Sequence, residues 1–404
     1  MVSRRTVAAK QRSLQQPRPR RSFSFSWRVV LLTLALYGGL LACRWKHNRS
    51  NQCTHLITYD PSYGGWNNQL LALFVGLHLA QLLGRRLVVP PLIERGRILT
   101  ELDWTDMLDI EPALHRQWIQ SRSERARCGQ QPATSTVAFD GRNISLRLHR
   151  DAACEEAITA LRAASAHAGP RLLQIANTYG LVRCFTRHDK SFLRLWQHAQ
   201  LRPTHVARHW LQQWQALETA SVRPLVIVVH VRSSGFEARA HQRRPHEFPG
   251  RTLHAWMLAG NGSACMHPAQ RSALCQICAI QRRDPDARPV HFYFMHDEHA
   301  ESLKVLAHWK AFVEASDQCG AAGGRVYDFT QSVWAAYEGF DTLSLVTEMY
   351  LAIYGAHLFV GSTLSTLSSN VARWRSLARY PLAPSLSYTG DRYLSAIPHI
   401  LGFH

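Results

Sequence analysis

The sequence predicts an α/β protein with two Rossmann-like domains, and two observations lead to this fold class. Residues 224–232 (PLVIVVHVR) form an apolar, β-branched run between Pro224 and a Ser-Ser-Gly segment, which is typical of a strand buried on both faces of a parallel sheet. Residues 55–89 read as strand, glycine loop, helix and strand, which is the order of a βαβ unit. We therefore expect one domain over residues 55–220 and a second over 221–404, facing each other across a cleft.

The first domain is expected to begin with a strand that leads through a glycine loop into a helix. Large apolar residues recur near helical spacing over residues 67–83, and Gly84 is expected to end that helix. The strands expected in this domain are 55–59, 86–89, 136–139 and 171–176, and the helices are 67–83 and 204–217. Thr204 is the expected cap of the second helix, and the polar stretch 117–132 is expected to be an exposed insertion.

The second domain is expected to alternate strands and helices after the strand at 224–232. Residues 233–268 are rich in His, Arg, Pro and Gly without a clear period, so we interpret them as an irregular loop. The strands expected beyond this loop are 290–295, 325–329 and 357–361, and the helices are 269–281, 298–315 and 342–354.

The N-terminal segment is basic and precedes an apolar run. Residues 1–28 contain eight of the chain's basic residues and no Asp or Glu, so much of the net charge of +19 lies in this segment. The other basic residues are scattered and do not alternate with aromatic residues as in a nucleic-acid-binding groove. Residues 29–43 carry no charge and have a flanking tryptophan near each end. We expect a cytosolic tail at 1–28, a transmembrane anchor at 29–45, a stem at 46–54 and a lumenal remainder. A cleaved signal peptide and a mitochondrial transit peptide are the alternatives.

A lumenal location agrees with the glycosylation sequons and the cysteines. Sequons begin at Asn48, Asn143 and Asn261. The cysteines after the anchor are even in number: Cys53, Cys128, Cys154, Cys184, Cys265, Cys275, Cys278 and Cys319. We expect structural disulfides, with pairing open, and treat a zinc or redox role of the CxxC at 275–278 as the alternative.

Three polar segments are expected at the carboxyl ends of strands, where open α/β sheets bind ligands. Gly64 and Gly65 lead into a helix N-terminus, Arg232 ends the central strand, and the hydroxyl-rich segment 361–370 follows another strand. Backbone N–H groups, a guanidinium and hydroxyls can all bind phosphate. Each feature alone is more often structural, as a turn, an ion pair or a helix cap, but their occurrence together favours an anion site.

Two acidic residues and one acidic motif were also considered. Asp297 follows the strand at 290–295 and Glu348 lies on the helix at 342–354, where each could orient a sugar hydroxyl, a nucleotide base or an arginine. An exposed or structural carboxylate is the commoner state of either. Residues 284–286 (DPD) match the metal-binding DxD of many sugar transferases, but their charged, proline-containing context is typical of a turn.

The same segments resemble those of one enzyme family. Residues 63–69 (YGGWNNQ) and 77–94 (LHLAQLLGRRLVVPPLIE) resemble the N-terminal motif of the GDP-fucose protein O-fucosyltransferases. Residues 230–232 (HVR) resemble the family's HxR motif, and 359–367 (FVGSTLSTL) its FxGx(2)SSF-type segment. The order and separation of the motifs also fit.

This resemblance implies a GT-B fold, a GDP-fucose donor and inversion at the sugar carbon without a metal or other cofactor. By position, Asn68 matches the family's loop asparagine at the reacting sugar, and Arg232 matches the arginine on the donor's β-phosphate. The other expected donor-binding residues are Gly64, Gly65, Trp66, Asn67, His230, Ser365, Thr366 and Leu367, with Asp297 and Glu348 as further candidates.

The sequence also departs from the family pattern. Gly65 stands where close relatives have a basic residue, and Thr366 and Leu367 replace Ser and Phe. The family's helical acidic position falls on Met349 unless the pairing shifts by one residue to Glu348. These differences indicate a divergent branch.

The resemblance leads us to expect a fucosyltransferase that moves fucose from GDP-fucose to a hydroxyl of a protein or glycan. Its partners would be the GDP-sugar donor, a glycoprotein or glycan acceptor and the membrane, with no nucleic acid. We expect a single-pass type II protein of the Golgi or ER membrane with a lumenal catalytic domain. The alternatives are a transferase of another GDP-sugar and a catalytically inactive lumenal sugar-binding protein.

Overall fold

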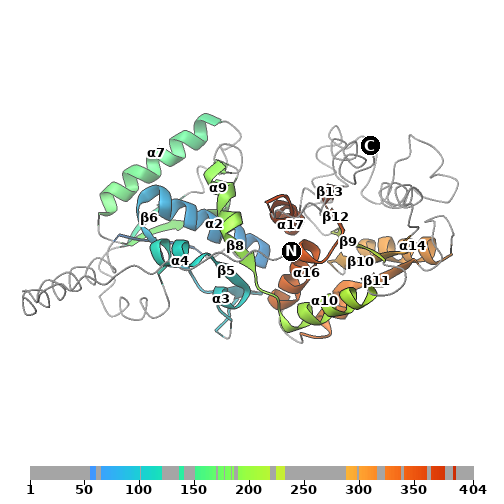
Figure 1. Cartoon of the computed structure of the whole chain (residues 1–404). Helices are drawn as coiled ribbons and strands as arrows, with labels where there is room; N and C mark the ends of the chain where they lie inside the picture. The colour runs from blue at the N-terminus through green and yellow to red at the C-terminus, as the bar shows by residue number, and fades with distance from the viewer. Residues whose placement is uncertain are drawn as a thin grey trace, which may run out of the picture. The chain divides into compact units, whose positions relative to one another are not determined.

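The computed structural model describes residues 55–60, 65–100, 102–120, 136–140, 151–169, 172–176, 178–182, 184–185, 190–218, 224–232, 288–297, 300–315, 324–337, 341–361, 365–377 and 385–387. All of them lie in one compact unit of the chain, residues 54–404 (Figure 1). The tail, anchor and stem predicted at 1–54, the loop at 233–268 and the helix at 269–281 lie outside the described residues. None of the described helices has the length and apolar character needed to cross a membrane.

The first sheet is parallel and is built from residues before 180. In spatial order its described strands are β2 (Arg86–Leu87), β1 (Leu56–Tyr59), β7 (Leu172–Ala176) and β6 (Thr136–Asp140). All four were predicted, although β2 is shorter than the expected 86–89. The backbone N–H of Val88 nevertheless donates to the carbonyl of Ile57 (2.8 Å), so the chain still follows β1 beyond the end of β2.

Helix α2 (Trp66–Leu83) packs directly on β1, as its apolar sequence predicts. A Cβ added at Gly76 would lie 2.7 Å from the ring of Tyr59, so this close approach requires the glycine. Gly84 ends the helix in the left-handed conformation (φ 62°), and its N–H donates back to the carbonyls of Ala80 and Gln81. The predicted helix end is therefore confirmed.

Helix α7 (Asp151–Ala168) was not predicted, and it packs against β6 and β7. The Arg85 guanidinium joins it to the sheet by donating to the Ser165 hydroxyl (2.7 Å) and to the carbonyl of Gly169 (2.8 Å). A disulfide links Cys154 of α7 to Cys184. One of the expected disulfides is thus present, and the other cysteines after residue 45 lie outside the described residues.

The second sheet is also parallel and contains the central strand predicted at 224–232. Its described strands, in spatial order, are β11 (Arg325–Asp328), β10 (Val290–His296), β9 (Leu225–Val231), β12 (Leu358–Gly361) and β13 (Ser385–Ser387). The order of the strands reverses between β9 and β12. In doubly wound sheets the crevice beyond the carboxyl ends of two such strands is the usual ligand site.

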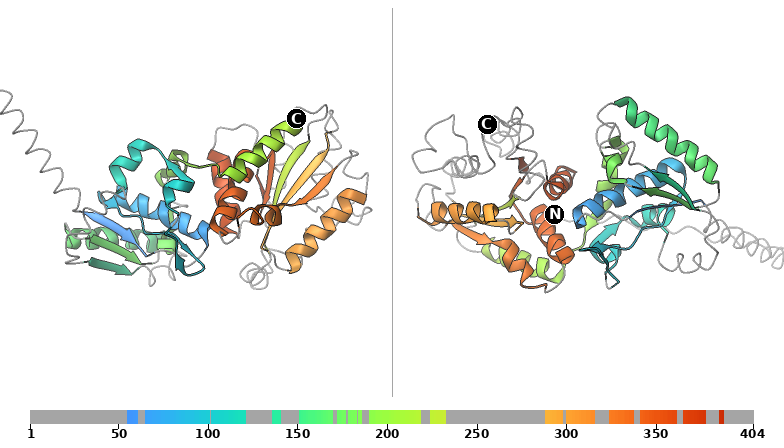
Figure 2. Two further views of the ribbon diagram at one scale, coloured as in Figure 1. Left: turned by 90° about the horizontal axis from the view of Figure 1, so that it is seen from below. Right: turned by 180° about the vertical axis from the view of Figure 1, so that it is seen from behind.

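Helices cover both faces of this sheet (Figure 2). Alternate β9 residues, including Ile227 and Val229, pack in one apolar cluster with Trp309 of α14 (Ala300–Ala315). Val226 and Val228 belong instead to the cluster that includes residues of α10 (His205–Glu218) and α16 (Asp341–Tyr354). This burial on two faces is what the unbroken apolar run predicts.

Helix α10 precedes the predicted domain boundary at 221, but it covers the second sheet. The ring of Trp214 lies 4.7 Å from that of Tyr293 on β10 and 6.2 Å from that of Phe329. Thr204 caps α10 as predicted, because its hydroxyl accepts a hydrogen bond from the Ala207 N–H (3.1 Å). The layers of the second sheet therefore begin before residue 221.

Shorter elements complete the described part of the chain. They are β3 (Ile93–Glu94), β4 (Arg97–Ile98), α3 (Trp104–Met107), β5 (Leu108–Ile110), α4 (Pro112–Trp118), η1 (Thr178–Leu181), α9 (Lys190–Leu195), η2 (Trp196–His198), β8 (Ala199–Leu201), α15 (Phe329–Trp334) and α17 (Thr366–Leu377). The prediction of an exposed insertion over residues 117–132 is wrong at its start. Ile119 and Gln120 are buried, and the Gln120 N–H donates to the Leu87 carbonyl. Residues 121–132 lie outside the described part.

Candidate active site

The first turn of α2 carries the predicted glycine-loop residues. Gly65 is exposed and immediately precedes α2, and no side chain caps this helix end. Its neighbour Trp66 is buried, with its ring 4.8 Å from that of Trp104. An uncapped helix N-terminus presents N–H groups and a positive dipole end to an anion. Gly64 lies outside the described residues.

Two asparagines and a glutamine follow in this turn, each in a different setting. Gln69 accepts a hydrogen bond from the Ile93 N–H (2.9 Å) and donates to the same residue's carbonyl, which fixes the chain beside α2. Asn67 is buried and accepts hydrogen bonds from Asn370 of α17. Asn68 is half-buried, and its Oδ1 is shielded from solvent without a hydrogen-bond partner among the described residues.

The carboxyl end of β9 places His230 next to α17, and Arg232 follows two residues later. His230 is buried, and its Nδ1 lies 2.7 Å from the Ser368 hydroxyl. Burial and the nearby Arg232 guanidinium lower the pKa of His230 to about 3, so the ring is neutral at pH 7. Arg232 is half-buried and directly follows the strand, and its contact with a donor phosphate stays a prediction.

The start of α17 carries the predicted hydroxyl segment. Ser365 is 1% exposed, and its hydroxyl has no hydrogen-bond partner among the described residues. Thr366 is half-buried, whereas Leu367 belongs to the apolar core. A Cβ added at Gly361 would lie 2.5 Å from the Ser368 hydroxyl oxygen, so the end of β12 meets α17 at a glycine.

A buried polar chain lies behind the end of β10. The Thr330 hydroxyl accepts from the His296 N–H (2.9 Å) and donates to a carboxyl oxygen of Glu348 (2.6 Å). Burial raises the pKa of Glu348 to about 8, so this carboxyl is protonated at pH 7. Asp297 accepts a hydrogen bond from the Ser302 hydroxyl (2.6 Å) and lies close enough to influence the pKa of His230.

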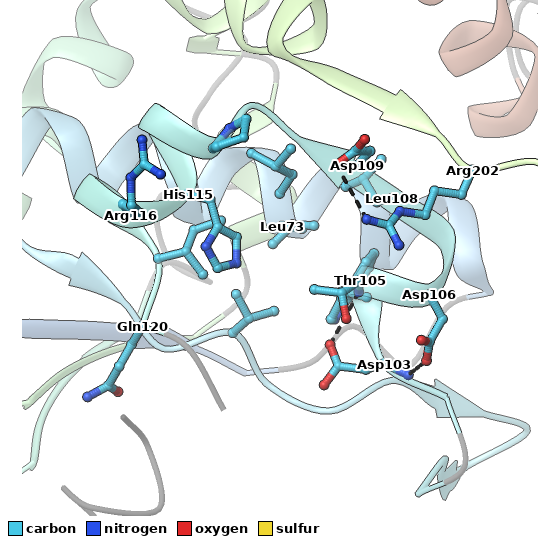
Figure 3. A pocket seen from close by; sticks show the side chains of 15 residues that line it. Leu73, Asp103, Thr105, Asp106, Leu108, Asp109, His115, Arg116, Gln120 and Arg202 are labelled. Carbon is cyan, nitrogen blue, oxygen red and sulfur yellow. Dashed lines mark hydrogen bonds and ion pairs between the residues drawn. The ribbon is translucent and has the colours of Figure 1, made fainter. Parts of the chain in front are cut away.

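A separate pocket of about 460 Å³ opens beside α3 and α4 (Figure 3). Leu73 lies at its base, His115 projects into it from one side, and the Asp109–Arg202 pair stands on the other. Trp104 also lines it and contacts Trp66, so the pocket adjoins the first turn of α2. The sequence did not predict this pocket, because its lining comes from short elements without a period.

The described contacts bring together segments that the sequence could only name separately. Helix α17 joins them, because Ser368 bonds His230 at the end of β9 and Asn370 bonds Asn67 at the start of α2. Leu367 of α17 is a predicted donor-binding residue, but its side chain belongs to the apolar core. The roles of Ser368 and Asn370 were missed, since nothing in either residue's local sequence indicates its partner.

No cluster of three or more metal-ligating side chains occurs within the described ranges. The DPD motif at 284–286 lies outside them. Independence from metal therefore stays a prediction.

No protein-family model matches the chain, and no curated protein matches its sequence. Among solved structures, POFUT1 in complex with GDP is similar over 83% of this chain and 98% of its own, with a TM-score of 0.50 and 13% identity. POFUT1 in complex with GDP-fucose covers 83% of this chain and 97% of its own (TM-score 0.48, 14% identity). The α-1,6-fucosyltransferase NodZ, soaked with GDP-fucose, covers 80% of this chain and 92% of its own (TM-score 0.42, 16% identity). At these identities the likeness to the POFUT1–GDP structure shows a similar fold, which agrees with the fold that the sequence motifs imply.

Proposed function

We propose that this chain is an inverting, metal-independent glycosyltransferase that moves fucose from GDP-fucose to a hydroxyl of a protein or glycan. The observation that carries the proposal is the meeting of the three motif segments around α17, at the switch point of the second sheet. The similar fold of POFUT1, solved in complex with GDP, supports it. We further propose a single-pass type II protein of the Golgi or ER membrane with this fold in the lumen.

Arg232 would bind the β-phosphate of the donor at the end of β9. When the bond from the sugar carbon to the phosphate oxygen breaks, its electron pair stays with GDP, and a bidentate guanidinium stabilises the added charge. Neighbouring His230 cannot contribute a positive charge, because its pKa of about 3 keeps it neutral. Arg232 is thus the proposed source of positive charge on the leaving group.

The buried atoms without partners fit the remaining donor contacts. Buried polar atoms in native proteins normally have hydrogen-bond partners, so Asn68 Oδ1 and the Ser365 hydroxyl are candidates to bond the sugar and the nucleotide. The acceptor hydroxyl would attack the sugar carbon from the face opposite the phosphate and, once the bond to the phosphate has largely broken, release its proton to water. Glu348 does not fit the role of general base, because with a pKa of about 8 it is mostly protonated at pH 7, and one oxygen of Asp297 already accepts a hydrogen bond from Ser302.

The test is a comparison of nucleotide-sugar donors with the purified full-length protein in detergent. We expect release of GDP from GDP-fucose, undiminished by EDTA, and none from GDP-mannose or UDP-sugars. Release from another GDP-sugar alone would identify a different transferase. Binding of GDP-fucose without release, even with lumenal glycoproteins added as acceptors, would identify a sugar-binding protein and contradict the proposal.

A further inference from the structure

Helices α2 and α17 lie next to each other (Figure 1). A pair of asparagines near their N-terminal ends joins them. The Asn370 side-chain nitrogen lies 3.0 Å from Asn67 Oδ1 and 3.3 Å from the Asn67 carbonyl oxygen. Asn67 is 7% exposed and Asn370 is fully buried. The contact links elements of the two sheets across 303 residues of sequence.

The surroundings fix the orientation of the Asn370 amide. The Arg373 guanidinium lies 3.5 Å from Asn370 Oδ1, and a guanidinium can only donate. The amide oxygen therefore faces Arg373 and the NH₂ group faces Asn67. Arg373 itself lies over the Trp196 ring, 5.5 Å from its centroid.

The asparagine pair differs from the apolar contact that holds the same helices together. Farther along both helices, Phe74 of α2, Trp196 of η2 and Trp374 of α17 pack ring against ring, and the Trp374 indole donates to the Ala199 carbonyl (3.0 Å). Large aromatic rings of this kind stabilise a contact chiefly by burying apolar surface. A directional amide pair adds little area, but it fixes the position of one helix end relative to the other.

Asn68 and Ser365, whose side-chain oxygens have no partner among the described residues, are close in sequence to this pair. Asn67 directly precedes Asn68, and Asn370 directly follows Ser369, whose N–H donates to the Ser365 carbonyl at the start of α17. We propose that Asn370 is a positioning residue: its hydrogen bonds to Asn67 hold Asn68, on the first sheet's helix, in the position that the reaction requires relative to Ser365 and Arg232. This inference rests on the proposed fucosyl transfer and names a residue on which its rate depends.

Loss of the asparagine pair should lower the rate of transfer without weakening donor binding. Without the pair, Ser365, His230 and Arg232 keep their places on the second sheet, so GDP affinity and the KM for GDP-fucose should stay near wild type. Asn68 would lose its fixed position, and a displacement of about 1 Å at a reacting centre can cost about 100-fold in rate. We expect Asn370→Asp, which keeps the shape but cannot donate when ionised, to lower kcat by about 10- to 100-fold.

The experiment is a double-mutant cycle with a matched interface control. Asn67→Ala and Asn370→Ala each remove the pair from one side, so the double variant should be no slower than the slower single variant. Trp374→Phe removes a different hydrogen bond of α17, the one to the Ala199 carbonyl, but keeps an aromatic ring in the cluster. We expect it to lower stability by a similar amount and to leave kcat unchanged. Asn67→Ala tests the pair independently should Asn370 variants fold poorly.

The outcomes distinguish this inference from the proposed function. Wild-type protein that releases no GDP from GDP-fucose overturns the proposed function and, with it, the role of Asn370. Active wild type with unchanged kcat in Asn370→Asp and Asn67→Ala overturns the positioning role alone. The positioning role is also overturned if Trp374→Phe lowers kcat as much as the asparagine variants do, because the loss of rate would then come from reduced interface stability.

Discussion

The closest packing at the candidate site is where β12 ends against α17, and replacing Gly361 by alanine perturbs it. The new Cβ would lie 2.5 Å from the Ser368 hydroxyl oxygen and 2.8 Å from both Ser368 Cβ and Phe359 Cε1. Ser368 cannot turn away freely, because its hydroxyl lies 2.7 Å from His230 Nδ1. Helix α17 must therefore move away from β12, or the His230 hydrogen bond must break.

The cost combines two effects. Overpacking of a well-filled interior costs about 1–3 kcal/mol, and loss of the hydrogen bond adds about 0.5–1.5 kcal/mol. We expect Gly361→Ala to lower the free energy of unfolding by about 2–4 kcal/mol. Because the start of α17 moves with it, we also expect GDP affinity to fall by at least about tenfold, equivalent to about 1.4 kcal/mol.

The assay pairs urea unfolding in detergent with calorimetric titration of GDP. Gly76→Ala is the matched control. Its new Cβ would lie 2.7 Å from Tyr59 Cδ1, so it causes a comparable clash on α2, near β1 and away from α17. We expect it to cost about 1–3 kcal/mol of stability without changing GDP affinity. If Gly361→Ala binds GDP as wild type does, or if both variants lose affinity equally, the clash at Gly361 does not weaken GDP binding by moving α17.

Further predictions concern pH and the disulfide. Glu348 titrates near pH 8 when folded and at its ordinary, lower pKa when unfolded, so its contribution to stability is complete at low pH and is lost as pH rises toward 8. His230, with its pKa lowered to about 3, contributes stability that is present above its ordinary pKa of 6.5 and lost as pH falls toward 3. In the wild type, titration of Glu348 should lower the free energy of unfolding by up to about 1.4 kcal/mol per pH unit as the pH rises from 5 to 8. Glu348→Gln should remove this fall, as measured by urea unfolding over the same pH range. A pH profile that the substitution leaves unchanged would show that Glu348 is ionised. Replacing Cys154 and Cys184 together by serine opens a loop that spans 30 residues and should cost about 3–4 kcal/mol, whereas a loss below about 1 kcal/mol would show that the link contributes little.

Local sequence patterns were sufficient for the elements on which the fold depends. Strand β9 is an unbroken apolar run, and α2 combines helical spacing with a glycine that adopts a left-handed conformation at its end. Helix α7 was not predicted, because much of the apolar part of its sequence is alanine, which marks a buried face less clearly than large apolar residues do. The packing of α10 on the second sheet was not predicted, because its tryptophans mark a buried face without indicating which sheet covers it.

The candidate site was predictable in its parts and not in its connections. The glycine loop, Arg232 and the hydroxyl segment could be found because helix starts and strand ends have recognisable residue types. The Asn67–Asn370 and His230–Ser368 pairs join residues 303 and 138 positions apart, and no local pattern encodes such pairs. Likewise, protonation of Glu348 at pH 7 depends on burial that only the packed structure reveals.

The rate of GDP release from GDP-fucose by wild-type protein and by Arg232→Ala shows whether this protein is a fucosyltransferase in which Arg232 stabilises the leaving phosphate. We expect release by the wild type and a loss of about 100- to 1,000-fold in the variant, with the fold retained, because the charge on the leaving phosphate loses its stabilising donor. Arg232→Lys should remain slow, since an ammonium lacks the planar fork. Release of GDP by Arg232→Ala at the wild-type rate, or none by the wild type, would contradict the account.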